Sequence, residues 1–266
     1  GSPSIFGSLI IFAIPIVAAL VYYEKKPLRK FLLFGVLGMM CLCDLFTFSR
    51  GSWVGLIVAM TLFAVLVDGR LIAAMLAAMG GVLVAVPSIA DRIAYLFTRD
   101  YLEASAAGGR SIRWETGMEL LKSRSQWLGY GLGRFGGAVA MNNRTDGDIE
   151  YFYLDNYYLK TLVESGYIGL IFFLLLLAFL AVYGLKAMLK AGSGERPDRS
   201  ADPLLRRVGS DSLLCAGLLC GLCGIAVHCL FENIFEEPYM MAYFWGLAAA
   251  MIVLPKAASE TEKVLR

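Results

Sequence analysis

Residues 166–185 read GYIGLIFFLLLLAFLAVYGL, a stretch with no charged side chain. A helix needs about 20 apolar residues to cross roughly 30 Å of hydrocarbon, so this stretch predicts a membrane span. Six further apolar blocks occur at residues 4–23, 31–47, 51–67, 71–86, 212–231 and 239–254. The chain is 58% hydrophobic and only 17% charged, against about 25% charged in soluble domains. We therefore expect an all-α, polytopic helical membrane protein with about seven transmembrane helices.

One long polar segment, residues 88–165, separates the fourth block from the fifth. Within it, residues 111–124 predict a short amphipathic helix, because Trp114, Met118 and Leu121 recur at helical spacing. The expected organisation has four parts. These are transmembrane helices 1–4 in residues 1–87, a large periplasmic loop with the candidate active site in 88–165, transmembrane helices 5–7 in 166–255, and a cytoplasmic tail in 256–266.

Basic residues indicate the orientation, because lysine and arginine collect in cytoplasmic loops. They cluster after the first block, between the fifth and sixth blocks, and in the C-terminal tail. Seven alternating spans put these three places on one side, the cytoplasm, and put residues 88–165 on the opposite face. The N-terminus then lies outside, which predicts that earlier spans precede this chain. The net charge of +2 gives no reason to expect nucleic acid as a partner.

Arg50 is the first candidate for a ligand contact. It lies between two apolar blocks on the outer side, where the charge rule disfavours basic residues. One interpretation is a snorkelling arginine at the membrane interface. The other is an anion clamp, because a guanidinium offers a planar fork that matches phosphate oxygens.

Arg110 and Arg113 are three residues apart, so they share one face of the expected helix. Together they are suited to bind a diphosphate at the membrane surface. The alternative is an ordinary charged helix face, since more charged residues follow along the same segment.

Asp155 and Asn156 directly precede the fifth span and are surrounded by aromatic and apolar residues such as Tyr153 and Tyr157. Partial burial raises the pKa of a carboxyl, which makes Asp155 a candidate proton acceptor near neutral pH. The alternative is an N-cap for the helix that follows, and the two roles are compatible for different members of the pair. Glu164 is a weaker candidate for the same chemistry.

Neither a metal nor a cofactor is expected. The cysteines lie in apolar blocks, and the Cys220-x-x-Cys223 spacing has no second ligand pair nearby. His228, the single histidine, lies in the sixth block; a membrane histidine can act as a proton relay, but a packing role is the favoured interpretation. The Gly131-x-Gly-x-x-Gly136 pattern resembles a dinucleotide fingerprint, but that motif needs a strand before it and a helix after it.

Several short motifs follow one another in a fixed order. They are Ser49-Arg50-Gly51-Ser-Trp, Gly108-Gly109-Arg110-x-x-x-Trp114, Gly129-x-Gly-x-Gly-Arg134-Phe, Leu154-Asp155-Asn156-x-Tyr158-Leu159 and Glu164-Ser-Gly-x-x-Gly169-Leu. Over residues 47–177 this order resembles the O-antigen ligase and polymerase superfamily of bacterial inner-membrane glycosyltransferases.

The resemblance implies an oligosaccharide on undecaprenyl diphosphate as the donor, a glycan acceptor, and metal-independent, inverting transfer at the periplasmic face. Arg50 and Arg110 match the arginines expected to hold the diphosphate, and Asp155 is the expected base. Ligases usually have His-Asn where this chain has Asp155-Asn156, and Asp-Asn is more similar to the polysaccharide polymerases. The remaining residues expected to bind substrate are Arg113, Asn156, Arg134, Tyr157 and Glu164. A chain-length regulator and the lipid bilayer are the other expected partners.

The leading hypothesis is therefore a polymerase of lipid-linked repeat units in the bacterial inner membrane. A ligase that moves finished glycan to a lipid core or a protein is the nearest alternative. A non-catalytic transporter of lipid-linked sugar is the second. Transport predicts ionisable residues deep in several spans, and the apolar blocks offer few, chiefly Asp44 and His228.

Overall fold

The computed structural model of the chain describes residues 2–106, 109–136, 140, 154–194 and 210–264. Within these ranges the chain forms helices and no strand, which confirms the all-α class. Four of the described helices are long and apolar enough to cross a membrane, so the chain is an integral membrane protein. They are α1 (Pro3–Tyr23), α3 (Arg50–Val67), α9 (Tyr157–Gly194) and α10 (Ser210–His228).

Three other spans expected from the sequence also coincide with helices. They are α2 (Pro27–Leu45), α4 (Arg70–Ala85) and α11 (Pro238–Val264). Charged residues interrupt the apolar character of α2, and the apolar part of α11 is short, Pro238–Leu254. By length and composition the described residues thus hold four spans, or five if a bent helix pair counts as one. The full number of seven stays a prediction.

The bent pair consists of α4 and α5 (Pro87–Ala94), whose axes differ by 98°. Pro87 explains the bend, because a proline disfavours helical backbone at the residue before it. Val86 accordingly has φ −127° and ψ 83°. The expected fourth span therefore ends where the sequence placed it, and a separate short helix follows.

The chain divides into two compact units. The first, which we call the bundle unit, comprises Gly1–Ala74, Leu177–His228 and Glu237–Arg266. The second, the site unit, comprises Met75–Leu176 and Cys229–Glu236, and contains all of the polar segment 88–165 that is described.

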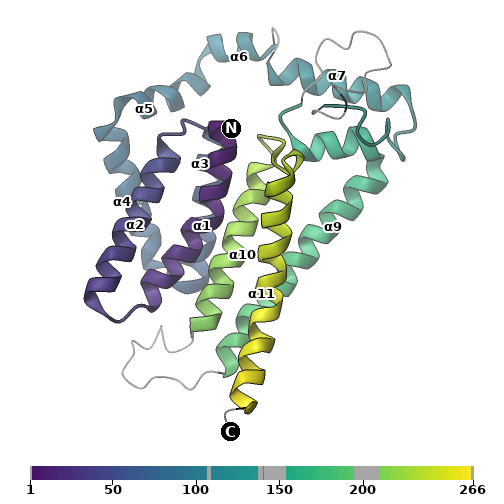
Figure 1. The fold of residues 1–266 in the computed structure, drawn as a ribbon. Helices are drawn as coiled ribbons and strands as arrows, with labels where there is room; N and C mark the ends of the chain where they lie inside the picture. The colour runs from purple at the N-terminus through teal and green to yellow at the C-terminus, as the bar shows by residue number, and fades with distance from the viewer. Residues whose placement is uncertain (1, 107–108, 137–139, 141–153, 195–209, 265–266) are drawn as a thin grey trace. The chain divides into compact units, whose positions relative to one another are not determined.

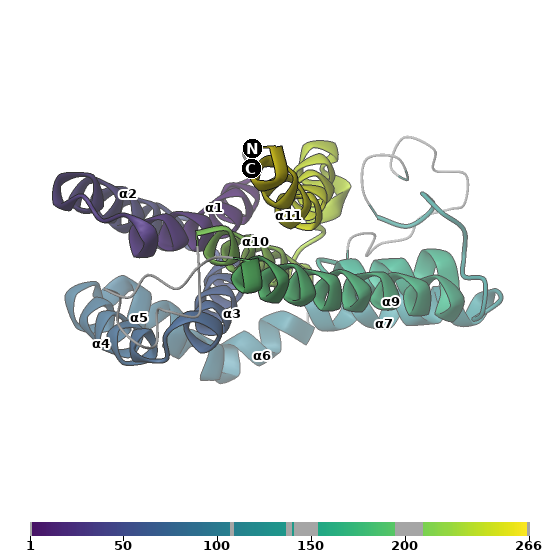
Figure 2. The same ribbon diagram turned by 90° about the horizontal axis from the view of Figure 1, so that it is seen from below.

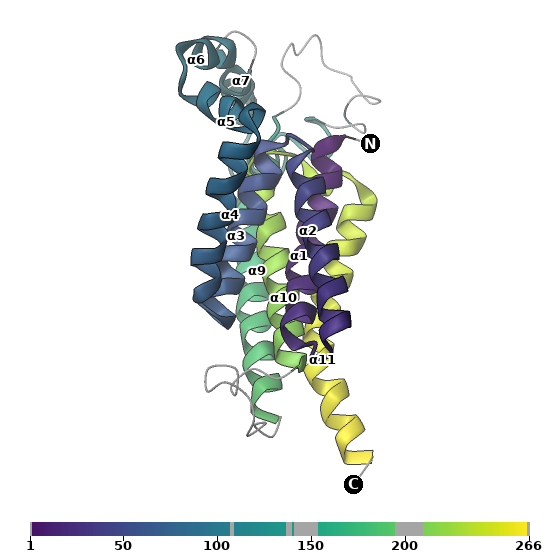
Figure 3. The same ribbon diagram turned by 90° about the vertical axis from the view of Figure 1, so that its left-hand side faces the viewer.

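In the bundle unit, α10 packs against α1, α3 and α11 (Figure 1). Figure 3 shows α1 and α2 side by side. Small residues allow the close approach, as is usual between membrane helices. A Cβ atom on Gly217 would lie 2.7 Å from the Pro15 carbonyl oxygen, and one on Gly221 would lie 2.9 Å from that of Phe12. Gly224 lies against both Ile11 of α1 and Ala59 of α3, because an added Cβ would be 2.8 Å from a side-chain carbon of each.

The site unit contains short helices and the first part of α9. The short helices are α5, η1 (Tyr95–Phe97), α6 (Arg99–Ala106), α7 (Arg110–Ser123) and η3 (Ile234–Glu236). Helix α7 forms where the sequence predicted one and lies alongside the first part of α9 (Figures 1 and 2). Its buried residues are Gly117 and Leu121, whereas Trp114 and Met118 remain partly exposed.

A break at Gly166 divides α9 into two segments, because Gly166 has φ 68° and ψ −171°. The break frees backbone groups on both sides, and the loop after α7 satisfies them. Val163 and Glu164 carbonyls accept from the N–H groups of Tyr130 (2.7 Å) and Gly131 (2.9 Å). Beyond the break, the Tyr167 and Ile168 N–H groups donate to the Gln126 (3.0 Å) and Trp127 (3.3 Å) carbonyls. The break coincides with the predicted start of the fifth span.

Candidate functional site

An ion pair joins α7 to the residues that precede α9. Arg113 donates from Nη1 to Asp155 Oδ2 at 2.8 Å, and both side chains are partly exposed. The next residue of α7, Trp114, donates from Nε1 to the carbonyl of Leu154, the residue before Asp155, at 2.9 Å. The structure thus brings together two of the residues singled out in the sequence, although 41 residues separate them along the chain.

The sequence left open two roles for Asp155 and Asn156, a proton acceptor and an N-cap for the helix that follows. Asn156 is the N-cap of α9, because its Oδ1 accepts from the Leu159 N–H at 3.0 Å. Asp155 has φ +49°, a left-handed conformation that few residues other than glycine, asparagine and aspartate adopt. The cap is thus formed by Asn156, while the Asp155 carboxylate pairs with Arg113.

The pKa of Asp155 is raised above its ordinary value, and the largest cause is burial. The positive charges of Arg113 and Arg110 act in the opposite direction, while the nearby Glu236 carboxylate raises the pKa further. A carboxylate in such surroundings accepts a proton more readily than one in water.

Arg110 lies one helical turn before Arg113, and its Nη2 donates to the Phe231 carbonyl at 3.0 Å. Phe231 belongs to the connection between α10 and α11. In the same connection, the Cys229 carbonyl accepts a hydrogen bond from the Tyr157 N–H at 2.8 Å. A guanidinium has five N–H donors, so the Phe231 contact uses only part of the capacity of Arg110.

Sequence reasoning missed the role of Lys160 and Glu236. Lys160 Nζ lies 2.9 Å from Glu236 Oε1 and 3.4 Å from Glu164 Oε2, and Lys160 and Glu164 are both buried. Glu164 also accepts from the Phe135 N–H at 3.1 Å. The four-residue spacing of Lys160 and Glu164 could have predicted the ion pair between these two residues. Nothing local predicted the contact with Glu236, which forms only when the connection after α10 packs on α9.

Aromatic rings pack beside these charges. The Tyr157 ring meets Phe235 edge-on with centroids 5.2 Å apart and Phe173 at 5.6 Å. Tyr157 thus contacts the same connection that accepts from Arg110 and pairs with Lys160. Its role in substrate binding stays a prediction.

Arg134 and Arg50 are placed differently. Arg134 is exposed in the glycine-rich turn, with its side chain over Gly131, and has no contact with Asp155 among the described residues. Arg50 is the first residue of α3 in the bundle unit, after Ser49, whose hydroxyl accepts from the Ser52 N–H at 3.4 Å. The roles of Arg50 and Arg134 in binding a substrate therefore stay predictions. Tyr153 and Gly108 lie outside the described residues.

His228 has hydrogen-bond partners at both ring nitrogens. Its Nδ1 lies 2.9 Å from Ser8 Oγ and its Nε2 lies 3.3 Å from Ser4 Oγ. This agrees with a packing role inside the bundle unit. Within the described ranges, no group of three or more histidine, cysteine, aspartate or glutamate residues has the geometry of a metal site.

The site can therefore offer a partly buried base beside two cations. The profile of a family described as O-antigen ligase matches residues 35–174, which is more than half of the 266 residues. The matched region includes Arg50 and every candidate residue of the site unit up to Glu164. No curated protein and no solved structure matches the chain. On the strength of this match, together with its apolar helices and the motifs around Arg50, Arg110 and Asp155, the chain belongs to the O-antigen ligase family.

Proposed function

We propose that the chain is a membrane glycosyltransferase that polymerises oligosaccharide repeat units carried on undecaprenyl diphosphate. Membership of the O-antigen ligase family supports glycan transfer from a lipid carrier. The Asp155-Asn156 pair supports polymerisation, through its similarity to the polysaccharide polymerases. The distribution of basic residues supports an inner-membrane protein whose site faces the periplasm.

The single observation that carries the proposal is the Arg113–Asp155 contact of 2.8 Å with Arg110 one turn away. A base is useful for transfer to a hydroxyl, and cations are useful for releasing a diphosphate. Here both kinds of group lie in one part of the site unit.

The proposed reaction is a single displacement. The acceptor hydroxyl oxygen attacks the anomeric carbon of the donor and forms the new glycosidic bond, while the bond from that carbon to the diphosphate oxygen breaks. The hydroxyl proton passes to the Asp155 carboxylate. Undecaprenyl diphosphate leaves with the bonding electrons, and the charges of Arg110 and Arg50 stabilise it. Attack opposite the leaving group inverts the anomeric centre, and the arginines take the place of a metal ion.

Three substitutions test this assignment in the full-length protein in cells. Arg50→Ala, Arg110→Ala and Asp155→Ala should each abolish long-chain polymer, while immunoblots of membrane fractions show normal insertion. Arg99→Ala, at an exposed position at the start of α6, is the matched control and should leave the polymer unchanged. Normal chain-length ladders from all three site variants would contradict the proposal.

The description of the family favours a second candidate, a ligase that transfers finished glycan to a lipid core or a protein. The two activities differ in what remains when the gene is deleted. Loss of a polymerase leaves single repeat units on the acceptor, whereas loss of a ligase leaves the acceptor bare. Gel analysis of the acceptor from a deletion strain separates them.

A further inference from the structure

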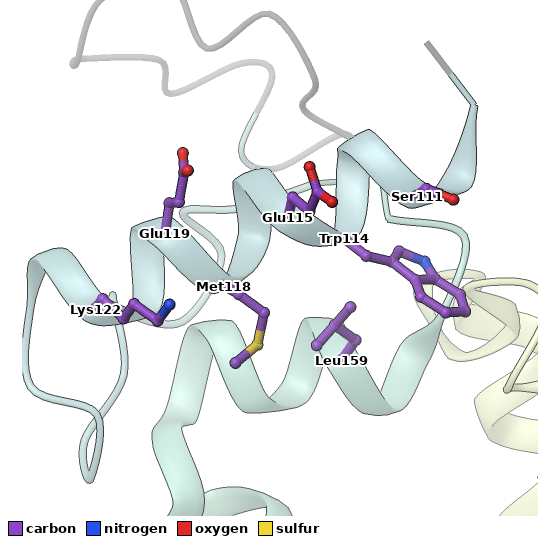
Figure 4. Close-up of a pocket in the computed structure, with 7 residues that line it drawn as sticks. All are labelled: Ser111, Trp114, Glu115, Met118, Glu119, Lys122 and Leu159. Atoms are coloured by element: carbon purple, nitrogen blue, oxygen red, sulfur yellow. The ribbon is translucent and has the colours of Figure 1, made fainter. Parts of the chain in front are cut away.

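An open groove of about 520 Å³ runs between α7 and the first segment of α9. Figure 4 shows Met118 and Leu159 pointing toward each other from the two helices, with Trp114 near one end and Lys122 near the other. The described residues that line it are Ser111, Trp114, Glu115, Met118, Glu119, Lys122 and Leu159. The groove, called the α7–α9 groove below, thus has an apolar floor and a polar rim.

Trp114 forms a fixed aromatic surface in this groove. Its Nε1 donates to the Leu154 carbonyl at 2.9 Å, and the residue remains 38% exposed. The hydrogen bond restricts rotation of the ring, so binding a ligand costs little side-chain entropy. A sugar ring has an apolar face of C–H groups that packs well on an exposed aromatic ring.

The rim of the groove is rich in hydrogen-bonding groups. Glu115 and Glu119 supply carboxylate acceptors, Lys122 supplies ammonium donors, and the Ser111 hydroxyl can do either. All four residues are exposed on the surface of α7. Glu115 and Glu119 repel each other at a four-residue spacing, which the i, i+3 pair of Glu119 with Lys122 offsets in part. A ligand with many hydroxyl groups would use them.

A membrane surface is the other ligand that an exposed tryptophan on a short helix can suggest. Helices that lie on membranes carry lysine and arginine on the polar face, because the leaflet is anionic. The rim of the α7–α9 groove has two carboxylates against one ammonium, which disfavours an anionic lipid surface. The charges therefore favour a neutral, hydroxyl-rich ligand.

The groove begins beside the candidate base. Trp114 directly follows Arg113, the partner of Asp155, and Trp114 is bonded to the residue before Asp155. On the α9 side, Leu159 is the residue whose N–H is capped by Asn156. From Ser111 to Lys122 the helix rises by about 16 Å, which leaves room for more than one sugar ring.

We propose that the α7–α9 groove binds the sugar units of the acceptor glycan that adjoin the attacking hydroxyl. The ligand class is a neutral oligosaccharide, stacked on Trp114 and hydrogen-bonded to Glu115 and Glu119. This inference rests on the proposed function, because it assigns an acceptor to the same site. It adds a subsite that selects the acceptor, separate from the arginines that bind the diphosphate.

Calorimetric titration of the full-length protein in nanodiscs of zwitterionic lipid tests the groove without using transfer activity. The probe is lipid-free oligosaccharide of two or three repeat units, released by mild acid from the polysaccharide of cells that make the protein.

Met118→Trp fills the groove, and the double variant Glu115→Ala/Glu119→Ala removes rim acceptors at exposed positions where folding is little affected. Leu132→Trp, which adds the same ring at an 80% exposed position in the glycine-rich turn, is the control for the first. Glu103→Ala on α6 is the control for the second.

Both groove variants should bind the oligosaccharide at least tenfold more weakly, and both should bind undecaprenyl diphosphate as the unaltered protein does. Wild-type affinity for the oligosaccharide in both variants would overturn the groove assignment, as would a parallel loss of undecaprenyl diphosphate. An altered affinity for vesicles with anionic lipid, with oligosaccharide binding intact, would overturn it in favour of a membrane contact. A transfer assay separates the two proposals: if the unaltered protein transfers no glycan in proteoliposomes, the proposed function fails while the titrations still decide on the groove. Normal transfer by Asp155→Asn would remove only the assignment of the base.

Discussion

Asp155 is restricted by its backbone as well as by its chemistry. A φ of +49° strains most residues, but a short polar side chain such as that of aspartate tolerates it. The neighbouring Asn156 cap stabilises the turn by about 1 kcal/mol. The carboxylate is thus fixed against Arg113 by local structure rather than by the ion pair alone.

Asparagine at position 155 separates fold from chemistry. Asp155→Asn keeps a side chain that tolerates the left-handed region, so the thermal unfolding midpoint should stay close to that of the unaltered protein. Without the carboxylate, the transfer rate in proteoliposomes should fall by roughly 10²–10⁴-fold, the contribution typical of a general base. A variant that keeps its full rate would show that Asp155 is not the base.

The pH dependence of transfer should report the pKa of Asp155. The carboxylate accepts a proton only when it is ionised, so the rate should decrease as the pH falls through this raised pKa. Arg113 lowers that pKa. Arg113→Gln should therefore raise the pKa and shift the rising limb of the pH–rate profile to higher pH. Arg99→Gln is the control, and a profile that stays in place in the Arg113 variant would contradict the assignment.

At this scale the sequence predicted the arginine pair and the carboxylate, because helical spacing and composition are local signals. It did not predict that Asn156 alone would form the cap, nor that Glu236 would join Lys160. Those contacts depend on how the connection at residues 229–236 packs on α9, and no periodicity records that packing.

Among the elements, the broken helix α9 determines where the site lies along the chain. Its two segments meet at Gly166, and both form backbone hydrogen bonds with residues 126–131. The glycine-rich loop therefore stabilises the break from both sides. Only glycine allows the loop to approach so closely at position 129, because a Cβ there would lie 2.5 Å from the Gly166 nitrogen. The sequence predicted the start of the span at this glycine, but gave no signal for the hydrogen bonds across it.

Gly166→Ala should destabilise the protein. A Cβ at this position would meet the Trp127 carbonyl and lie 2.6 Å from the Leu128 nitrogen. The backbone conformation at this position is essentially restricted to glycine and alone costs an alanine about 1–3 kcal/mol. The unfolding midpoint in nanodiscs should fall by several degrees, while Gly81→Ala, in open space on α4, should leave it equal or higher. Equal midpoints for Gly166→Ala and the unaltered protein would argue against a rigid break.

For the whole molecule, helical class and membrane insertion follow from composition, since long apolar blocks leave a bilayer-spanning helix as the main way to satisfy the backbone. Which helices touch could not be predicted, because most blocks are apolar on every side. The contacts of α10 with α1 and α3 depend on where small residues coincide, at Gly217, Gly221 and Gly224.

Gly221→Val tests this packing. The new side chain would meet the backbone of Phe12, so α1 and α10 would have to separate. Overpacking of this kind costs about 1–3 kcal/mol. The thermal midpoint should fall in proportion, whereas Gly246→Val, where nothing lies within 4 Å of the added Cβ, should change it little. A stable Gly221→Val variant would mean that α10 does not approach α1 through its glycines.

The position of the break also shields the site from changes in the span. In a helix, each inserted residue turns everything before it by about 100° about the axis. Asp155 and Arg113 both precede Gly166, and Trp114 donates to the Leu154 carbonyl beside them. A residue inserted beyond position 168 therefore turns the carboxylate and the guanidinium together. Changes in span length that suit a thicker or thinner bilayer can accumulate without altering the alignment of the base.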